Sequence, residues 1–186
     1  GAVFDDVLKS SLPDGYSLSR KTFYQFAADS SPRKSILVVT QHLDLVKADV
    51  SALLDLACRG NKILIASSSF SPLLADTLGF NNSYAYFNRR RLKEYAADLL
   101  ERDSVFWIGD SAVYDKRTFR FYPHLCGIYF TKYDSLSLPL ATSRIDSMQM
   151  FNDSLPDCFP PVAISRPFGR GEIVLVTTPL LFTNYG

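Results

Sequence analysis

The sequence is poor in the residues that bind metals or form disulfides. Its 186 residues include 3 cysteines and 2 histidines. The cysteines are Cys58, Cys126 and Cys158, an odd number with no CxxC spacing, which argues against a disulfide framework and against a zinc site. Whether Cys126 and Cys158 pair is left open by their spacing. We therefore expect neither a metal nor a cofactor.

The chain also lacks a strong net charge and any long apolar run. Its formal net charge is +1, so no overall field attracts nucleic acid, and we expect no nucleic-acid partner. No apolar stretch reaches the roughly 18 residues that a membrane-spanning helix needs, and no signal peptide is visible.

The residues that are present fit a globular protein. Apolar residues make up 47% and charged residues 21% of the chain, which is typical of a folded domain. The length suits one domain over residues 1–186. The aromatic share is high, with 14 Phe and 10 Tyr.

The first half of the chain alternates strand and helix patterns. Residues 35–40, SILVVT, and 62–67, KILIAS, are continuous apolar runs typical of strands that are buried on both faces. Residues 46–57 have the apolar spacing of an amphipathic helix, and Ser71-Pro72 predicts the start of another. This order predicts parallel strands joined by helices.

The second half has a different pattern. From about residue 80 to 160, short aromatic strand candidates alternate with turns, which predicts an antiparallel excursion that resembles an insertion. Residues 162–177 then predict a hairpin with a glycine-containing turn.

Residues 60–79, GNKILIASSSFSPLLADTLG, resemble the nucleophile segment of class I glutamine amidotransferases. In those enzymes a buried strand ends at a sharp elbow that carries a cysteine, and a helix follows. The alignment places Ser68 at the nucleophile position, with Ala66 and Phe70 in place of the flanking glycines. In the same family, His-Pro-Glu follows the last strand, and here the triplet is Thr178-Pro179-Leu180. The catalytic histidine and glutamate positions are therefore occupied by residues without that chemistry.

The whole chain resembles the domain of unknown function 4350 family of bacteria. The resemblance rests on the opening amphipathic helix, on LLDLACRGNKILIAS and on the closing GRGEIVLVTTPLLFTNYG. It implies a soluble, extracytoplasmic domain of a protein anchored in the bacterial inner membrane by segments outside this chain. Together, the two resemblances imply a mainly parallel, flavodoxin-like α/β sheet with helices on both faces, plus the antiparallel excursion at about 80–160.

In such sheets ligands bind at the carboxyl ends of the strands. The candidate cleft residues there are Thr40, Gln41, His42, Ser67, Ser68, Ser69, Thr178 and Pro179. The vacant base position favours a noncatalytic binding or assembly module, so we expect no enzyme. The alternative is a hydrolase or amidotransferase-like enzyme that uses Ser68 as nucleophile and His42 as base.

Two other features predict contacts with partners. Arg89, Arg90 and Arg91 are candidates for anion binding, because guanidinium groups present planar donor forks; the alternative is a solvated helix start paired with nearby acidic residues. The aromatic region 84–133 contains more rings than a small strand layer needs, which predicts a surface for another protein. Cys58 is predicted to be a small buried residue of a helix.

Overall fold

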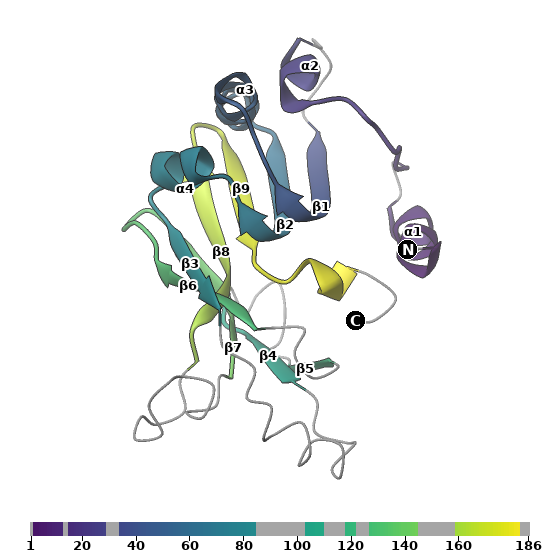
Figure 1. Cartoon of the computed structure of the whole chain (residues 1–186). Coiled ribbons are helices and arrows are strands. Elements are labelled where there is room, and N and C mark those ends of the chain that lie inside the picture. The colour runs from purple at the N-terminus through teal and green to yellow at the C-terminus, as the bar shows by residue number, and fades with distance from the viewer. Residues whose placement is uncertain are drawn as a thin grey trace.

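The computed structural model describes residues 2–12, 15–28, 34–84, 103–109, 118–121, 127–144 and 159–182. Helices and strands follow one another along the chain as Figure 1 shows. Their bounds are α1 Ala2–Ser11, α2 Phe23–Ala27, β1 Ser35–Leu43, α3 Lys47–Cys58, β2 Lys62–Phe70, α4 Pro72–Leu78, β3 Asn81–Tyr84, β4 Asp103–Trp107, β5 Thr118–Phe121, β6 Ile128–Lys132, β7 Leu138–Ser143, β8 Pro161–Phe168, β9 Gly171–Val176 and the 3-10 helix η2 Pro179–Phe182.

The main sheet is mixed, and the prediction of a mainly parallel, flavodoxin-like sheet is wrong. Its order is β1-β2-β9-β8-β7-β4-β5. Only the pairs β1–β2 and β2–β9 are parallel, whereas the pairs β9–β8, β8–β7, β7–β4 and β4–β5 are antiparallel. The reason lies in the connections, because the two-residue turn at Gly169-Arg170 can join only antiparallel strands. The antiparallel pairing predicted for the middle of the chain thus extends over most of the sheet, while β3 and β6 form a separate antiparallel pair.

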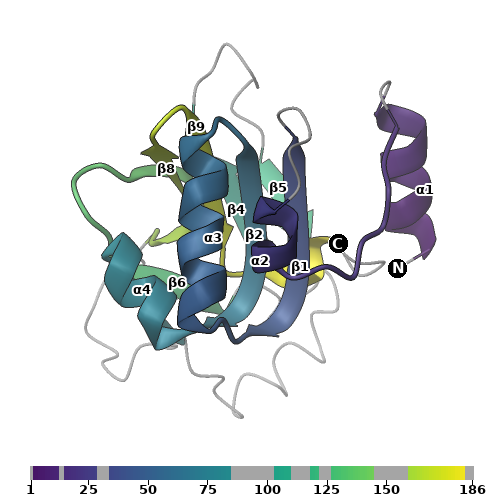
Figure 2. The ribbon, with the colours of Figure 1, turned by 90° about the horizontal axis from the view of Figure 1, so that it is seen from above.

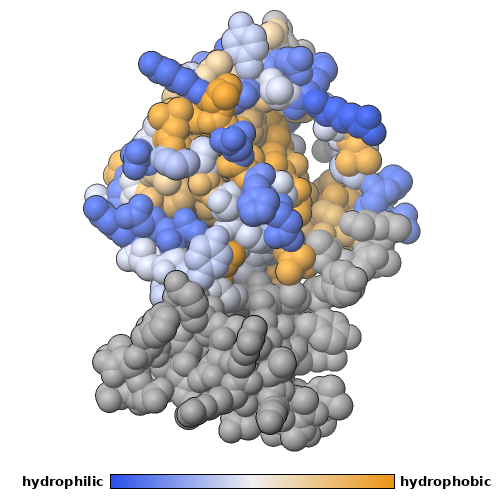
Figure 3. All heavy atoms as spheres, in the orientation of Figure 1, coloured by the Kyte–Doolittle hydropathy of each residue, from blue (hydrophilic) through white to orange (hydrophobic). Residues whose placement is uncertain are grey.

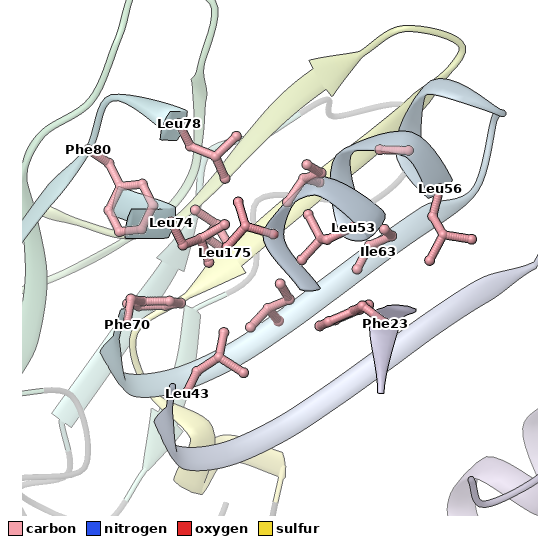
Figure 4. Close-up of a cluster of buried hydrophobic side chains, with 14 of the residues drawn as sticks. Phe23, Leu43, Leu53, Leu56, Ile63, Phe70, Leu74, Leu78, Phe80 and Leu175 are labelled. Atoms are coloured by element: carbon pink, nitrogen blue, oxygen red, sulfur yellow. The ribbon is translucent and has the colours of Figure 1, made fainter. Parts of the chain in front are cut away.

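Helices α2, α3 and α4 all cover one face of the sheet, so the prediction of helices on both faces is also wrong (Figure 2). They enclose the larger hydrophobic core, in which Leu53, Ile63 and Leu175 are almost fully buried (Figure 4). The opposite face of the sheet buries a smaller cluster against Trp107, Tyr129 and the side chains of η2. Rings and a 3-10 turn replace the expected second helix layer there.

Local sequence signals account for the helix ends. The hydroxyl of Ser71 accepts the N–H of Leu74 at the start of α4, and Gly79 ends this helix in the left-handed conformation at φ +69°, as the pattern predicts. At α2, Thr22 and Gln25 form a capping box. Helix α3 differs, because its N-cap is Val46 without a side-chain hydrogen bond.

Helix α1 forms where the opening apolar pattern predicts it, yet it lies apart from the other helices (Figures 1 and 2). The ring of Phe4 packs edge-on against Phe182 of η2, with centroids 5.8 Å apart. Hydrogen bonds to Asp5 from Lys9 and from the Tyr16 hydroxyl hold the pKa of the Asp5 carboxyl below its usual value. This hydrogen bonding fastens the segment after α1 to the helix itself.

Candidate functional site

The candidate cleft residues lie at the carboxyl ends of β1, β2 and β9, where the prediction put them, but both β1 and β2 run further than expected. Strand β1 continues to Leu43 and β2 to Phe70. The pairing passes from Thr40–Ser67 to His42–Ser69 and ends at Leu43–Phe70. Ser68 therefore lies inside a paired strand, and the structure has no elbow there.

Within β1 the alternation of side chains changes at residues 40–42. The even-numbered residues Ile36 and Val38 face the helix-covered core. Further along the strand the odd-numbered Leu43 faces the same core, so the side of the strand that points inward has changed between them. The hydroxyl of Thr40 donates to the carbonyl of His42 at 3.0 Å. A side-chain bond to a backbone group two residues on is typical of a local departure from regular strand geometry.

The neighbouring strand β2 shows the same change at the paired positions. Ile63 and Ile65 face the core and then Phe70 does. The hydroxyl of Ser67 donates to the carbonyl of Ser69 at 2.7 Å and accepts the N–H of Ser69 at 3.3 Å. We call the segments Thr40–His42 and Ser67–Ser69 together the paired distortion; the hydroxyls of Thr40 and Ser67 satisfy backbone groups of their own strands.

Ser68 and Gln41 occupy the middle of the paired distortion. The hydroxyl of Ser68 donates to the amide oxygen Oε1 of Gln41 at 3.1 Å. A carboxamide oxygen accepts a hydrogen bond but does not act as a base near pH 7. His42 is exposed and is paired in register with Ser69, one residue beyond Ser68.

The residues that follow β9 cover the end of this site. Thr178, at the position of the amidotransferase histidine, is 1% exposed, and its hydroxyl has no hydrogen-bond partner. Pro179 is buried at the start of η2, and this turn packs against β1 and β2 beneath their carboxyl ends (Figure 1). Leu180, at the position of the glutamate, carries no charge. The chain itself thus fills part of the space in which the sequence placed a ligand cleft.

Sequence reasoning missed two polar contacts between elements of the fold. Thr177 is fully buried and its hydroxyl donates to the carbonyl of Ile128 at 2.6 Å, which ties β9 to β6. Arg166 on β8 forms a half-buried ion pair with Asp134 and also donates to the carbonyl of Leu78 at 3.4 Å. No local pattern could have revealed these pairs, because the partners are brought together only by the order of the strands.

The rings predicted to form a partner surface have mixed exposure. Tyr84 and Phe119 are exposed, at 54% and 41%, whereas Phe130 is buried in the core at 2%. Phe106, Trp107, Tyr129 and Tyr133 are half-buried. Tyr86, Phe87, Tyr114 and Tyr122 lie outside the described residues, as do Arg89, Arg90 and Arg91.

Other predicted features can be checked in the part of the chain that the structure describes. Cys58 is exposed, which corrects its assignment as a buried residue: the last turn of α3 directs it toward the turn at Gly169 and not into the core. Cys126 and Cys158 lie outside the described ranges. The described His, Cys, Asp and Glu residues form no group of three or more that could hold a metal ion. None of the described helices combines the length and the apolar character that a membrane span requires.

These features define an α/β domain with a mixed sheet, one helix-covered face and an uncharged cluster of hydroxyls and an amide at the ends of its parallel strands. The chain belongs to the family described as Domain of unknown function (DUF4350), which matches residues 2–186. The family resemblance inferred from the sequence is thereby confirmed.

Comparisons with other proteins add distant similarities of structure. The chain is similar to part of the exo-β-1,4-mannosidase Op5Man5 from Opitutaceae bacterium strain TAV5, at 12% identity and a TM-score of 0.44, covering 83% of this chain and 22% of that one. It is also similar to part of the cold-adapted β-galactosidase from Rahnella sp. R3, at 11% identity and a TM-score of 0.48, covering 81% and 21%. A β-galactosidase from Bacillus circulans sp. alkalophilus gives 10% identity, a TM-score of 0.47 and coverage of 78% and 20%. The chain thus spans about a fifth of these proteins. No curated protein matches it in sequence.

Proposed function

We propose that this chain is a noncatalytic binding or assembly module of a membrane-anchored bacterial protein, and a degenerate relative of the class I glutamine amidotransferases. The observation that carries the proposal is the hydrogen bond from the Ser68 hydroxyl to Gln41 Oε1. Among the residues that the structure describes, the only side chain hydrogen-bonded to the Ser68 hydroxyl is the Gln41 amide, which cannot take up its proton.

Acyl transfer by a serine requires three parts: the nucleophile, a base in hydrogen-bond reach and donors for the oxyanion. Here the base position holds Thr178, whose hydroxyl stays protonated at neutral pH. The orienting carboxylate is replaced by Leu180. Without a base the Ser68 hydroxyl keeps its proton and remains a poor nucleophile, so turnover is not expected.

The binding partner in this proposal is another protein. Exposed Tyr84 and Phe119 support contact through the aromatic region 84–133, because aromatic side chains contribute strongly to protein interfaces. Anchoring in the bacterial inner membrane, with this domain on the extracytoplasmic side, would come from segments outside the chain.

An activity-based probe tests the noncatalytic character. Wild type, Ser68→Ala, His42→Ala and Ser69→Ala are incubated with a fluorophosphonate probe and examined by intact-protein mass spectrometry, beside an active serine hydrolase. We expect no adduct on any of the four. An adduct on wild type and on Ser69→Ala that is lost in Ser68→Ala and in His42→Ala would overturn the proposal and establish the Ser68–His42 enzyme instead.

The partner is tested in cells that express the full-length protein. A photo-crosslinking amino acid replaces Tyr84 or, as a control on another exposed surface, Thr77. We expect a cross-linked partner protein from position 84 alone, in the membrane fraction. The absence of any adduct from position 84, or recovery of the protein in the soluble fraction, would contradict that part of the proposal.

A further inference from the structure

One long edge of the main sheet is open. Strand β1 lies at the end of the strand order and pairs only with β2. Among the described residues, no backbone hydrogen bond reaches its other side. This edge therefore presents a row of main-chain donors and acceptors to any strand that approaches it.

The edge lacks two of the usual protections against such pairing, proline and charge. The nine residues of β1, SILVVTQHL, include no proline and no charged residue. The opposite edge of the sheet is β5, which is only four residues long and contains Arg120. Natural proteins shorten exposed edges or place charges in them to prevent unwanted pairing, so an unprotected long edge indicates a strand that is meant to be paired.

Apolar side chains are exposed on both sides of the position that an added strand would take. Leu37 and Val39, which point away from the helix-covered core, are 39% and 37% exposed. Figures 1 and 2 place α1 beyond the open edge, at the height of η2 in the view of Figure 1 and below α2 and α3. Val7 of α1 is 51% exposed. Apolar atoms reach the surface on this side of the molecule (Figure 3). An added strand would thus lie between β1 and α1 and cover exposed apolar side chains of both.

We propose that the added strand is β1 of a second copy of this chain, antiparallel to the first with Val38 at the two-fold axis. In this register Leu37 of each copy lies opposite Val39 of the other. Centring the axis on Leu37 would place Val39 opposite Ser35, and centring it on Val39 would place Leu37 opposite Gln41. Only the Val38 register pairs both exposed apolar residues with apolar partners, at the short cross-strand distances that stabilise sheets.

The resulting interface is isologous and closes after two copies, as in most homodimers. It joins the two sheets into one and removes the open edge from each. This inference deepens the assembly role in the proposed function by naming one contact and its partner. It involves a different surface from the aromatic region and is independent of any chemistry at Ser68.

Sedimentation velocity on the whole chain provides the first test. At about 100 µM, a micromolar dissociation constant leaves mostly dimer, and we expect wild type to sediment as one. Val39→Lys places a charge against Leu37 of the other copy, twice per dimer, and should weaken association by about tenfold or more. The control is Leu138→Lys, at an apolar position that is more exposed than Val39 (59% against 37%) and lies on the interior strand β7; this variant should remain dimeric. Circular dichroism confirms that both variants are folded.

Cross-linking tests the register. In a chain with all three native cysteines replaced by serine, Leu37→Cys and Val39→Cys variants are oxidised separately and as a mixture. The Val38 register predicts a disulfide-linked dimer in the mixture and little in either variant alone, because each position faces the other one. A wild-type monomer at the concentration stated, a dimer that survives Val39→Lys, or a mixture with no excess cross-link overturns the inference. None of these results affects the noncatalytic character of Ser68, which depends on the probe experiment alone.

Discussion

The first residue of β9, Gly171, lies so close to the end of α3 that it can carry no side chain. A Cβ built on Gly171 would lie 2.2 Å from the carbonyl oxygen of Asn61 and 2.4 Å from that of Ala57, well inside the 3.0 Å below which real Cβ atoms are essentially not found. Both neighbours are backbone atoms and cannot rotate away. In Gly171→Ala the start of β9 must therefore move by roughly 1 Å, and this kind of overpacking costs about 1–3 kcal/mol.

Such a shift also strains the hydrogen bonds that flank Gly171. The N–H of Arg170 donates to the carbonyl of Cys58 and the N–H of Glu172 to that of Asn61, each at 3.3 Å. Losing both adds about 1–3 kcal/mol, and the lower entropy of the unfolded alanine chain offsets about 0.4–1 kcal/mol. We expect a net loss of about 1–6 kcal/mol in the free energy of unfolding, with a middle value of about 3 kcal/mol.

Urea denaturation followed by circular dichroism measures this loss, with the midpoint and the slope fitted separately. Gly15→Ala is the control, because Gly15 has a positive φ of +77° but nothing within 4 Å of its would-be Cβ; it should cost only the left-handed strain of about 1–2 kcal/mol. If Gly171→Ala lost no more stability than Gly15→Ala, the close approach of β9 to α3 would be refuted.

Further substitutions test other parts of the fold. Leu53→Ala removes a fully buried side chain from the core and should lower the free energy of unfolding by about 2–5 kcal/mol. Leu73→Ala, on the exposed side of α4, should lower it far less. Equal losses of stability in urea denaturation would contradict the core assignment. Arg166→Met leaves Asp134 without its half-buried partner and should lower the free energy of unfolding by about 1–3 kcal/mol, after discounting for exposure. Adding Asp134→Asn removes the unpaired charge and should restore part of the lost stability. A double variant less stable than Arg166→Met would refute the pairing. The pKa of Asp5 is lowered chiefly by its hydrogen bonds from Lys9 and Tyr16. The Asp5 carboxylate therefore stabilises the folded protein at pH values above the pKa that Asp5 has in the unfolded chain. This stabilisation is lost as the pH falls through the lower pKa of Asp5 in the folded protein. A carboxyl NMR titration should give a midpoint below 3.8 that rises in Tyr16→Phe, and an unchanged midpoint would contradict the hydrogen bond.

The local elements of the first half were predictable because their signals are local. Apolar periodicity predicted α1 and α3, continuous apolar runs predicted β1 and β2, and Ser71-Pro72 with Gly79 predicted both ends of α4. Each depends on residues within one or two turns of the chain. The closing hairpin was predictable for the same reason, since its turn contains Gly169 and both strands flank it directly.

The order of the strands was not predictable in this way. Alternating strands and helices at 35–79 predicted a mainly parallel sheet, but the parallel part ends at β9. Strands β7, β4 and β5 extend the sheet by pairing residues up to 38 positions apart, such as Val105 with Ser143. Short aromatic strands have similar patterns whether they add to the main sheet or form a separate layer, so the sequence could not distinguish the two. The Arg166–Asp134 pair depends on that same strand order and was missed with it.

The candidate site shows how a resemblance in sequence can predict a wrong local geometry. The anchor residues of α4 placed Ser68 at the nucleophile position, and the prediction assumed that the strand ended there in an elbow. An elbow needs glycines beside the nucleophile, because the turn holds side chains in strained and crowded conformations, and here Ala66 and Phe70 stand in their place. Phe70 instead packs edge-on against Phe80 at a centroid distance of 5.3 Å, which keeps β2 extended to its last residue. The strand accommodates the change of face through the hydroxyls of Thr40 and Ser67, which bond their own backbones. The serines that suggested chemistry therefore have a structural use in the paired distortion, and the absence of flanking glycines was the sequence signal that distinguished a distorted strand from a catalytic elbow.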